Sequence, residues 1–101
     1  MAKLIWTEKA VAQIEEIGLF IEQDSPFQAH RVIQTIFNEA QRLKDFPRLG
    51  KMIPEVQEDT YREIRIFSYR LFYRIITEKR IAILGVVHGQ KLFDTTWLEM
   101  N

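Results

Sequence analysis

The sequence contains no cysteine, only three prolines and four glycines, and no long apolar run. Without cysteine, neither a disulfide nor a zinc site with thiolate ligands can form, and this composition fits a reducing compartment. The apolar runs are far shorter than the ~20 residues of a membrane-spanning helix, and the start lacks the apolar stretch of a secretory signal. We therefore expect a cytoplasmic protein with no membrane partner.

An excess of one charge is also missing, because 14 basic and 14 acidic residues cancel. The charges are nevertheless unevenly distributed along the chain. Residues 1–61 contain seven Lys or Arg and ten Asp or Glu, whereas residues 62–91 contain seven Lys or Arg and only two Asp or Glu. A basic segment of this kind predicts a surface that meets an anion or an acidic partner, with simply solvated arginines as the alternative.

Residues for metal or nucleophilic catalysis are scarce. The two histidines, His30 and His88, lie on different predicted elements, and no Asp or Glu cluster stands at ligand spacing around them. The sequence has no glycine-rich phosphate loop and no serine in a nucleophile elbow. We therefore expect neither a metal nor a cofactor.

The N-terminal half has the pattern of a strand followed by two helices. A short apolar run at 3–6 predicts the strand, and apolar side chains at three- and four-residue steps predict a helix at 8–22. Ser25 followed by Pro26 signals a new helix, because serine caps free amide groups and proline has no amide hydrogen to satisfy. This second helix is expected to end near Phe46.

The C-terminal half has the pattern of a loop at 47–60, a β-meander and a short helix at 92–100. Three segments rich in aromatic and β-branched residues predict antiparallel strands, at 61–67, 69–77 and 80–88. The predicted fold class is α+β, with an N-terminal strand, an α-helical hairpin packed on one face of a small antiparallel sheet, and a short C-terminal helix. The length of 101 residues predicts a single domain, residues 1–101.

Alternation along the predicted strands separates two faces. If the apolar set faces the helical hairpin, Arg65, Arg70 and Arg74 come together on the opposite face, with Phe67 and Phe72 among them. Arg62 falls at the strand's edge. One layer of helices leaves the second face of an antiparallel sheet open, and arginines interleaved with aromatic rings suit phosphate and base contacts.

Six segments, taken in order, resemble those of a known family: IWTEKAVAQIEEI, SPFQAHRVI, FPRLGK, REI, YRLFYRI and ILGVVHGQK. Together they resemble the RelE/ParE superfamily of bacterial toxins from type II toxin–antitoxin pairs, over nearly the whole chain. The resemblance implies a toxin of a stress-response system and a cognate antitoxin protein as its partner.

Within this superfamily the resemblance implies one of two activities. RelE-like members are ribosome-dependent, metal-independent mRNA endonucleases, and Arg70 matches their arginine near the scissile phosphate. ParE-like members are not nucleases and inhibit DNA gyrase. Gln90 or Lys91 stands where a second basic catalytic residue is expected in RelE-like members. The long helical hairpin and the HGQK ending favour the ParE-like branch, so we predict gyrase inhibition.

The alternatives assign different roles to the same residues. A nuclease would use Arg65, Arg70 and His88 as catalytic residues, with His88 as general acid. For binding of the antitoxin, and of gyrase or the ribosome with its mRNA, the candidates are Arg62, Arg65, Arg70, Phe72, Arg74, His88 and Lys91. A second alternative is a non-catalytic peptide-binding module. Phe27 and Phe37 are expected in the core, with the antitoxin or a homodimer contact as the other use.

Overall fold

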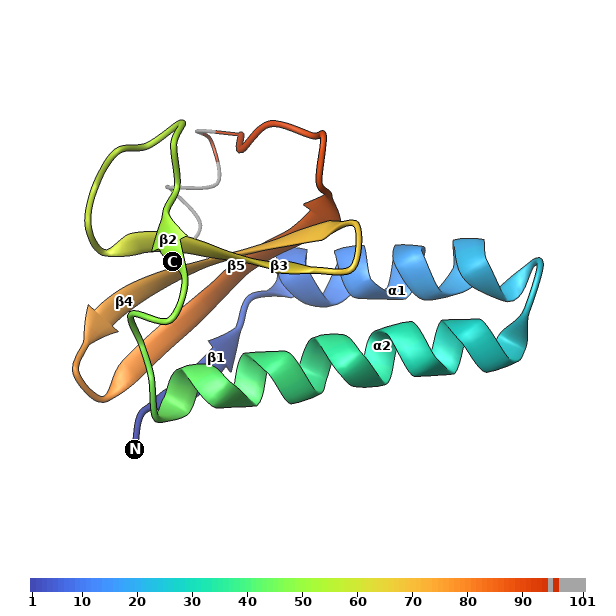
Figure 1. Ribbon diagram of the computed structural model, residues 1–101, viewed down its shortest axis with the longest axis horizontal. Coiled ribbons are helices and arrows are strands. Elements are labelled where there is room, and N and C mark those ends of the chain that lie inside the picture. Colours follow the sequence, from blue (N-terminus) through green and yellow to red (C-terminus); the bar gives the residue numbers. More distant parts are fainter. Residues whose placement is uncertain (95, 97–101) are drawn as a thin grey trace.

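The protein is described by a computed structural model for residues 1–94 and 96. Its elements follow in the order β1 (Lys3–Trp6), α1 (Glu8–Glu22), α2 (Pro26–Gln41), the 3₁₀-helix η1 (Arg42–Lys44), β2 (Lys51–Met52), β3 (Tyr61–Ile66), β4 (Tyr69–Thr77) and β5 (Arg80–His88) (Figure 1). The predicted order of strand, helical hairpin and meander is confirmed. The C-terminal helix predicted at 92–100 falls largely on residues outside this description.

The sheet has five strands in the order β1-β5-β4-β3-β2. Its three long strands form the predicted antiparallel meander. β1 lies beside β5 and runs parallel to it, so the sheet is mixed rather than purely antiparallel. The short strand β2 pairs with β3 and falls within the segment predicted as a loop.

Side-chain caps begin both helices. The Thr7 hydroxyl accepts from the backbone N–H of Ala10 at 3.2 Å and donates to the Ile83 carbonyl of β5 at 2.8 Å, which ties the start of α1 to the sheet. Ser25 accepts from the N–H of Gln28 at 3.1 Å, as its position before proline predicts. The two helices run antiparallel beneath one face of the sheet and extend past its end (Figure 1).

A first core fills the space between the helical hairpin and the sheet. Its buried members are Ala2, Ala10, Ile14, Ile36, Ala40, Leu43, Ile66, Leu71, Tyr73, Ile81, Ile83 and Val86. Phe37 contacts Trp6 at the margin of this core, with ring centroids 4.9 Å apart. The core placement of Phe27 and Phe37 is wrong, because Phe27 is 74% exposed at the first turn of α2 and Phe37 is 37% exposed.

A second core covers the opposite face of the sheet, so the prediction of an open face is wrong. Its buried members are Ile53, Tyr61, Phe72, Ala82, Leu84, Val87 and Phe93. The loop between β2 and β3 and the segment after β5 lie over this face (Figure 1). The sheet presents apolar side chains on both faces, and burying them is favourable by about 25 cal/mol per Å². The face is therefore closed by segments that have no periodic pattern.

The FPRLGK segment is fixed by Tyr73, which lies at the centre of β4. The Tyr73 hydroxyl donates to the Pro47 carbonyl at 2.6 Å and accepts from the Gly50 N–H at 3.0 Å. Burial raises the pKa of this phenol. Gly50 also packs directly on the backbone of β3, since a Cβ there would stand 2.3 Å from the Glu63 carbonyl oxygen.

Replacing Gly50 tests its close approach to the backbone of β3. Gly50→Ala should lower the free energy of unfolding by about 1–3 kcal/mol, because the added methyl group meets backbone that cannot yield without displacing β3. Gly18→Ala is the matched control, since its Cβ meets only the flexible end of Ile33 at 2.6 Å. The control should stay within about 1 kcal/mol of the parent, because alanine favours the helix by a similar amount. Urea unfolding followed by circular dichroism measures both, and equal losses would contradict this packing.

Candidate functional site

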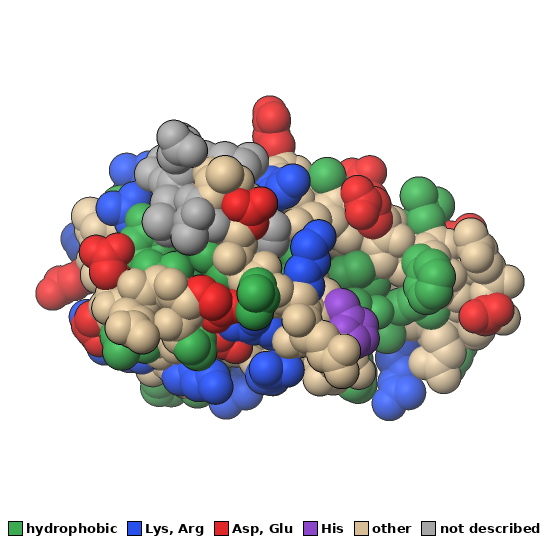
Figure 2. Space-filling view, turned by 90° about the horizontal axis from the view of Figure 1, so that it is seen from above, with side chains coloured by type: hydrophobic (Ala, Val, Ile, Leu, Met, Phe, Trp, Pro, Cys, Tyr) green, Lys and Arg blue, Asp and Glu red, His purple; other side chains and the backbone are tan. Residues whose placement is uncertain are grey.

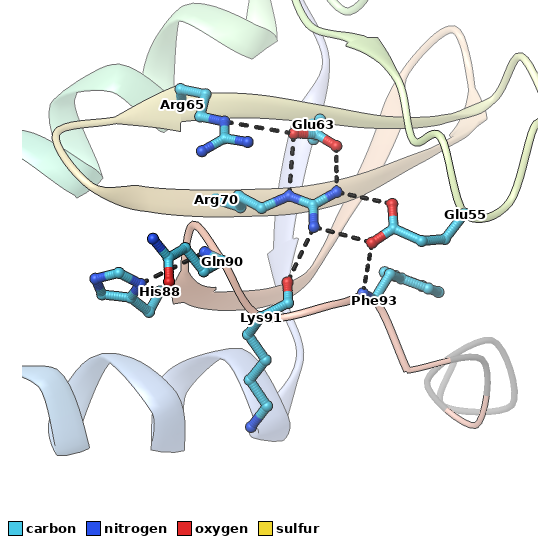
Figure 3. Close-up of polar contacts among 8 residues, drawn as sticks. All are labelled: Glu55, Glu63, Arg65, Arg70, His88, Gln90, Lys91 and Phe93. Carbon is cyan, nitrogen blue, oxygen red and sulfur yellow. Dashed lines mark hydrogen bonds and ion pairs between the residues drawn. The ribbon is translucent and has the colours of Figure 1, made fainter.

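The Arg70 guanidinium is the centre of a buried polar network on the second face (Figure 3). Its Nε and Nη2 donate to the two carboxylate oxygens of Glu63 at 3.2 and 2.6 Å. Its Nη1 and Nη2 donate to the two oxygens of Glu55 at 2.9 Å each, and Nη1 also donates to the Lys91 carbonyl at 2.9 Å. A guanidinium has five N–H donors, and these contacts use all of them. We call these four residues the Arg70 network.

Ion pairing in this network outweighs the cost of burying its charges. Arg70 is only 5% exposed, and a buried cation is tolerated where carboxylates pair with it. Hydrogen bonds from Arg70 lower the pKa of Glu55 to about 2, against the opposing effect of burial. Hydrogen bonds to Glu55 and Glu63 raise the pKa of Arg70. The lowered pKa of Glu55 and the raised pKa of Arg70 therefore indicate that this pair is ionised at neutral pH.

The network fastens the segment after β5 to the sheet. Glu55 accepts a hydrogen bond from the Phe93 N–H at 2.9 Å, and Arg70 holds the Lys91 carbonyl. The Phe93 ring packs edge-on against Phe72 at 4.9 Å, and the Arg70 guanidinium lies over the same Phe72 ring at 4.6 Å. Phe72, predicted as a binding residue, is therefore a core residue, fully buried.

A second set of ion pairs joins the basic segment to the preceding loop. Arg62 donates to Asp59 Oδ1 at 2.6 Å and to the Gly50 carbonyl at 2.7 Å, and its side chain is 14% exposed. Arg48 pairs with the same Asp59 carboxylate. Both arginines lower the pKa of Asp59, Arg48 most strongly. Much of the positive charge of residues 62–91 is thus neutralised inside the molecule.

The predicted catalytic residues are only partly brought together. Arg65 and Arg70 lie directly opposite each other in the β3–β4 register, and the Arg65 side chain is 57% exposed. His88 lies opposite Tyr69 at the end of β5 and lines a groove with Ile17 of α1, on the helix side of the sheet. The His88 ring points away from the Arg70 guanidinium (Figure 3).

Lys91 and His88 share this groove, which has a volume of about 290 Å³ and lies between α1 and the ends of β4 and β5. Its apolar lining includes Phe20 and Tyr69. Hydrophobic side chains also gather on this side of the molecule, toward the free end of the helical hairpin (Figure 2). The Lys91 side chain thus belongs to one face of the protein, while its carbonyl belongs to the Arg70 network on the other.

Arg74 lies on the same face as Arg70 but makes different contacts. Its guanidinium stands 5.3 Å from the centre of the Tyr61 ring. Its Nε is buried and has no hydrogen-bond partner among the described residues. Arg74 therefore borders the second core next to the β3–β4 pairing and is not part of the Arg70 network.

The turn between β3 and β4 holds an aromatic residue in an unfavourable backbone conformation. Phe67 has a φ of 53°, and it is the first of two residues in the turn, a place where glycine is usual. Strain of this kind costs about 1–3 kcal/mol. The Arg31 guanidinium lies 5.8 Å from the ring centre, but an exposed cation–π contact contributes only about 0.5–1 kcal/mol. The contact with Arg31, which is the contact found for this ring among the described residues, does not offset the strain of a phenylalanine here.

Neither a metal site nor a membrane span is found within residues 1–94 and 96. No group of three His, Asp or Glu residues in this part of the chain could hold a metal ion. No helix in it is long and apolar enough to cross a membrane.

Glu55 and Phe93 were not predicted as site residues, and Glu63 and Phe67 were placed on the face opposite the helices without being given a role. Glu63 carried a usable signal, because strand alternation places it on the same face as Arg70, where a buried carboxylate needs a cation. Glu55 and Phe93 lie in aperiodic segments, and no local pattern identifies either residue as an anchor. Phe67 could have been recognised as a bulky residue in a two-residue connection between strands.

Comparison with known proteins agrees with this architecture. The family model described as ParE toxin of type II toxin-antitoxin system, parDE, matches residues 4–93. The chain belongs to the ParE toxin family. As such it is the toxin component of a type II toxin–antitoxin system, which confirms the resemblance at the level of the superfamily.

Individual relatives of this ParE toxin family member carry names from both branches. Putative toxin Y4kP of Sinorhizobium fredii is 31% identical over 91 residues, which cover 88% of this chain and 90% of that protein. Toxin RelE2 of Caulobacter vibrioides is 25% identical over 92 residues, covering 91% of this chain and 100% of that protein. A chain in the solved chromosomal ParDE TA system from P. aeruginosa shares the fold, with a TM-score of 0.72, 22% identity and coverage of 89% and 98%.

The depressed pKa of Glu55 predicts an acid-dependent part of the toxin's stability. A carboxylate whose pKa falls from 4.5 to about 2 on folding contributes stability that is present above pH 4.5 and lost as the pH falls toward 2. The contribution is up to about 3 kcal/mol at 1.36 kcal/mol per pKa unit. Glu55→Gln should remove this part of the pH dependence between pH 4.5 and 2, measured by urea unfolding at several pH values.

The control for Glu55→Gln is Asp59→Asn, which removes an exposed carboxylate from the same loop. Solvent screens exposed ion pairs, so this variant should keep most of the parent's pH profile. An unchanged profile for Glu55→Gln would contradict the ionised network.

Arg65 and Arg70 are partners across β3 and β4, and replacing each of them distinguishes a structural role from a surface role. Arg70→Met should lower the free energy of unfolding by about 3–5 kcal/mol, because it leaves the Glu55 and Glu63 carboxylates buried without their cation. Arg65→Met should change it by no more than about 0.5 kcal/mol, since the Arg65 side chain is 57% exposed. Guanidinium chloride unfolding measures both, and an Arg70→Met protein as stable as Arg65→Met would refute the assignment.

Proposed function

We propose that this toxin acts by inhibiting DNA gyrase and that a cognate antitoxin neutralises it. The ParE family match supports this activity, while the similarity to a protein named RelE2 keeps mRNA cleavage as the alternative. The observation that favours gyrase inhibition over mRNA cleavage is that the Arg70 guanidinium already donates five hydrogen bonds. An arginine that stabilises a scissile phosphate needs donors free to bind it, and all five donors of Arg70 are engaged within the chain.

The surroundings of Arg70 also disfavour a phosphate. A hollow of about 400 Å³ at this place is lined by Lys51, Arg65 and Arg70, but also by the carboxylates Glu55 and Glu63. Two carboxylates repel a phosphate group, and Arg70 is already neutralised by them. His88, the candidate general acid, lies on the other side of the sheet. Catalysis through these residues would require the Arg70 network to open.

The segment after β5 is the best-supported surface for gyrase. The Arg70 network fixes its backbone at Lys91 and Phe93, while Leu92 between them is 71% exposed. An apolar side chain held outward by anchored neighbours is a suitable contact for a protein partner, because little entropy is lost when it binds. We therefore assign the gyrase contact to the segment that begins at Lys91.

The antitoxin can use only part of the predicted binding set. Phe72 and Arg70 are buried, so an antitoxin could reach them only by displacing the segments that cover the second face. Arg65 and Lys91 are exposed and stay in the set of proposed contacts.

Two assays run in parallel test the activity. The purified toxin should block supercoiling of relaxed plasmid DNA by gyrase and leave mRNA on programmed ribosomes intact. Cleaved mRNA together with unaffected gyrase would overturn the proposal in favour of the nuclease. Silence in both assays would favour the non-catalytic binding module.

A matched pair of leucines tests the location of the contact. Leu92→Ala should raise the toxin concentration for half-maximal gyrase inhibition by about tenfold, the effect of ~1.4 kcal/mol of lost contact. Leu19→Ala, which truncates a leucine that is 65% exposed on α1, should leave that concentration unchanged. Equal effects of the two substitutions would refute the assignment to the segment after β5.

A further inference from the structure

The β3–β4 turn combines strain, exposure and positive charge in one place. Phe67 is held at a φ of 53° although glycine would relieve the strain, and its side chain is 55% exposed. A large ring kept at a strained surface position indicates a contact outside the chain, because local strain is typically retained at functional sites.

Two arginines lie near the β3–β4 turn. The Arg31 guanidinium lies 5.8 Å from the centre of the Phe67 ring, and Arg65 stands two residues before Phe67 on β3. Among the described residues Arg31 has no carboxylate partner, and Arg65 has only Glu63 at a loose 3.9 Å. Both guanidinium groups are therefore available to an anion.

Gly89, the residue after β5, is hydrogen-bonded to the β3–β4 turn. The Gly89 N–H donates to the Ser68 carbonyl at 2.6 Å. A Cβ at position 89 would stand 2.5 Å from Arg65 Nη1, so the Arg65 side chain passes directly over this glycine. Gly89 thus leaves room for the Arg65 guanidinium close to the backbone of Ser68 in the β3–β4 turn.

We propose that Phe67, Arg31 and Arg65 form a contact site for single-stranded nucleic acid. An exposed aromatic ring offers a face on which an unpaired base stacks, and arginines beside it bind the adjacent phosphates. An acidic peptide would match the arginines but would give no reason for a strained phenylalanine. Arg65 lines the same hollow as Leu92, which is assigned to gyrase, but Phe67 and Arg31 do not line it, so substitutions at Phe67 and Arg31 distinguish this site from the gyrase contact.

A fluorescein-labelled 15-nucleotide oligo(dT) is the probe, with binding to the full-length toxin followed by fluorescence anisotropy. We expect a dissociation constant in the range of about 10⁻⁴ to 10⁻⁶ M, typical of non-specific binding. Two phosphate contacts predict a slope of about −1.4 for log K against log salt concentration. The absence of salt-dependent binding by the parent protein would overturn the proposal.

Substitutions at Phe67 distinguish the effect of the aromatic ring on binding from the effect of backbone strain on stability. Phe67→Gly should weaken oligonucleotide binding about tenfold while the melting temperature stays the same or rises, because glycine adopts positive φ without strain. Phe67→Tyr should retain the binding, since it keeps an aromatic face. Binding that is equal for all three proteins would contradict the proposal, as would loss of binding only in variants that unfold.

The arginines have their own control. Arg31→Gln and Arg65→Gln should each weaken binding and reduce the magnitude of the salt slope by about 0.7. Arg42→Gln, which changes an arginine paired with Glu39 at 3.3 Å on the helix surface, should leave both unchanged. A polyglutamate peptide of equal charge should not compete with the oligonucleotide at equal concentration. If polyglutamate does compete, and if its binding is weakened by Phe67→Gly as much as oligonucleotide binding is, the assignment to nucleic acid would be overturned.

Discussion

The structure of the second sheet face depends on one cation whose hydrogen-bonding capacity is fully used. Arg70 draws Glu63 of the neighbouring strand, Glu55 of the preceding loop and the Lys91 carbonyl to a single guanidinium. These contacts close an apolar face that a single layer of helices would leave exposed. They also set the direction in which the chain leaves β5. The same arginine that suggests catalysis in the sequence is thereby occupied with holding the fold together.

The elements of the fold could be predicted because their signals are local. Ser25 before Pro26 announces the second helix, and alternation along residues 69–77 assigns Leu71 and Phe72 to opposite faces. The cover of the second face could not be predicted, because Glu55 and Phe93 meet Arg70 and Phe72 from segments without periodicity. Pairings of this kind depend on how the chain folds back over the sheet, and no spacing in the sequence encodes them.

The sequence predicted which arginines lie together in the candidate site better than it predicted what those arginines bind. Arg65 and Arg70 were expected to lie together, and they do, but one is a surface residue and the other is buried between carboxylates. The acidic N-terminal part and the basic C-terminal part neutralise each other across the Arg62–Asp59 and Arg70–Glu55 pairs. The charge left for partners is therefore smaller than the sequence suggests, and it includes charge at the β3–β4 turn, the end of β5 and the β4–β5 turn with Lys79 and Arg80.

Whether Arg70 has a free donor can be measured by nitrogen-15 NMR of the arginine side chains. We expect separate, slowly exchanging signals for the guanidinium protons of Arg70, because each proton is held by an acceptor. Arg65 should show a single averaged signal that exchanges rapidly with water, as an exposed side chain does. An averaged and rapidly exchanging guanidinium at Arg70, like that of Arg65, would show that its donors are free and return Arg70 to the candidates for phosphate binding.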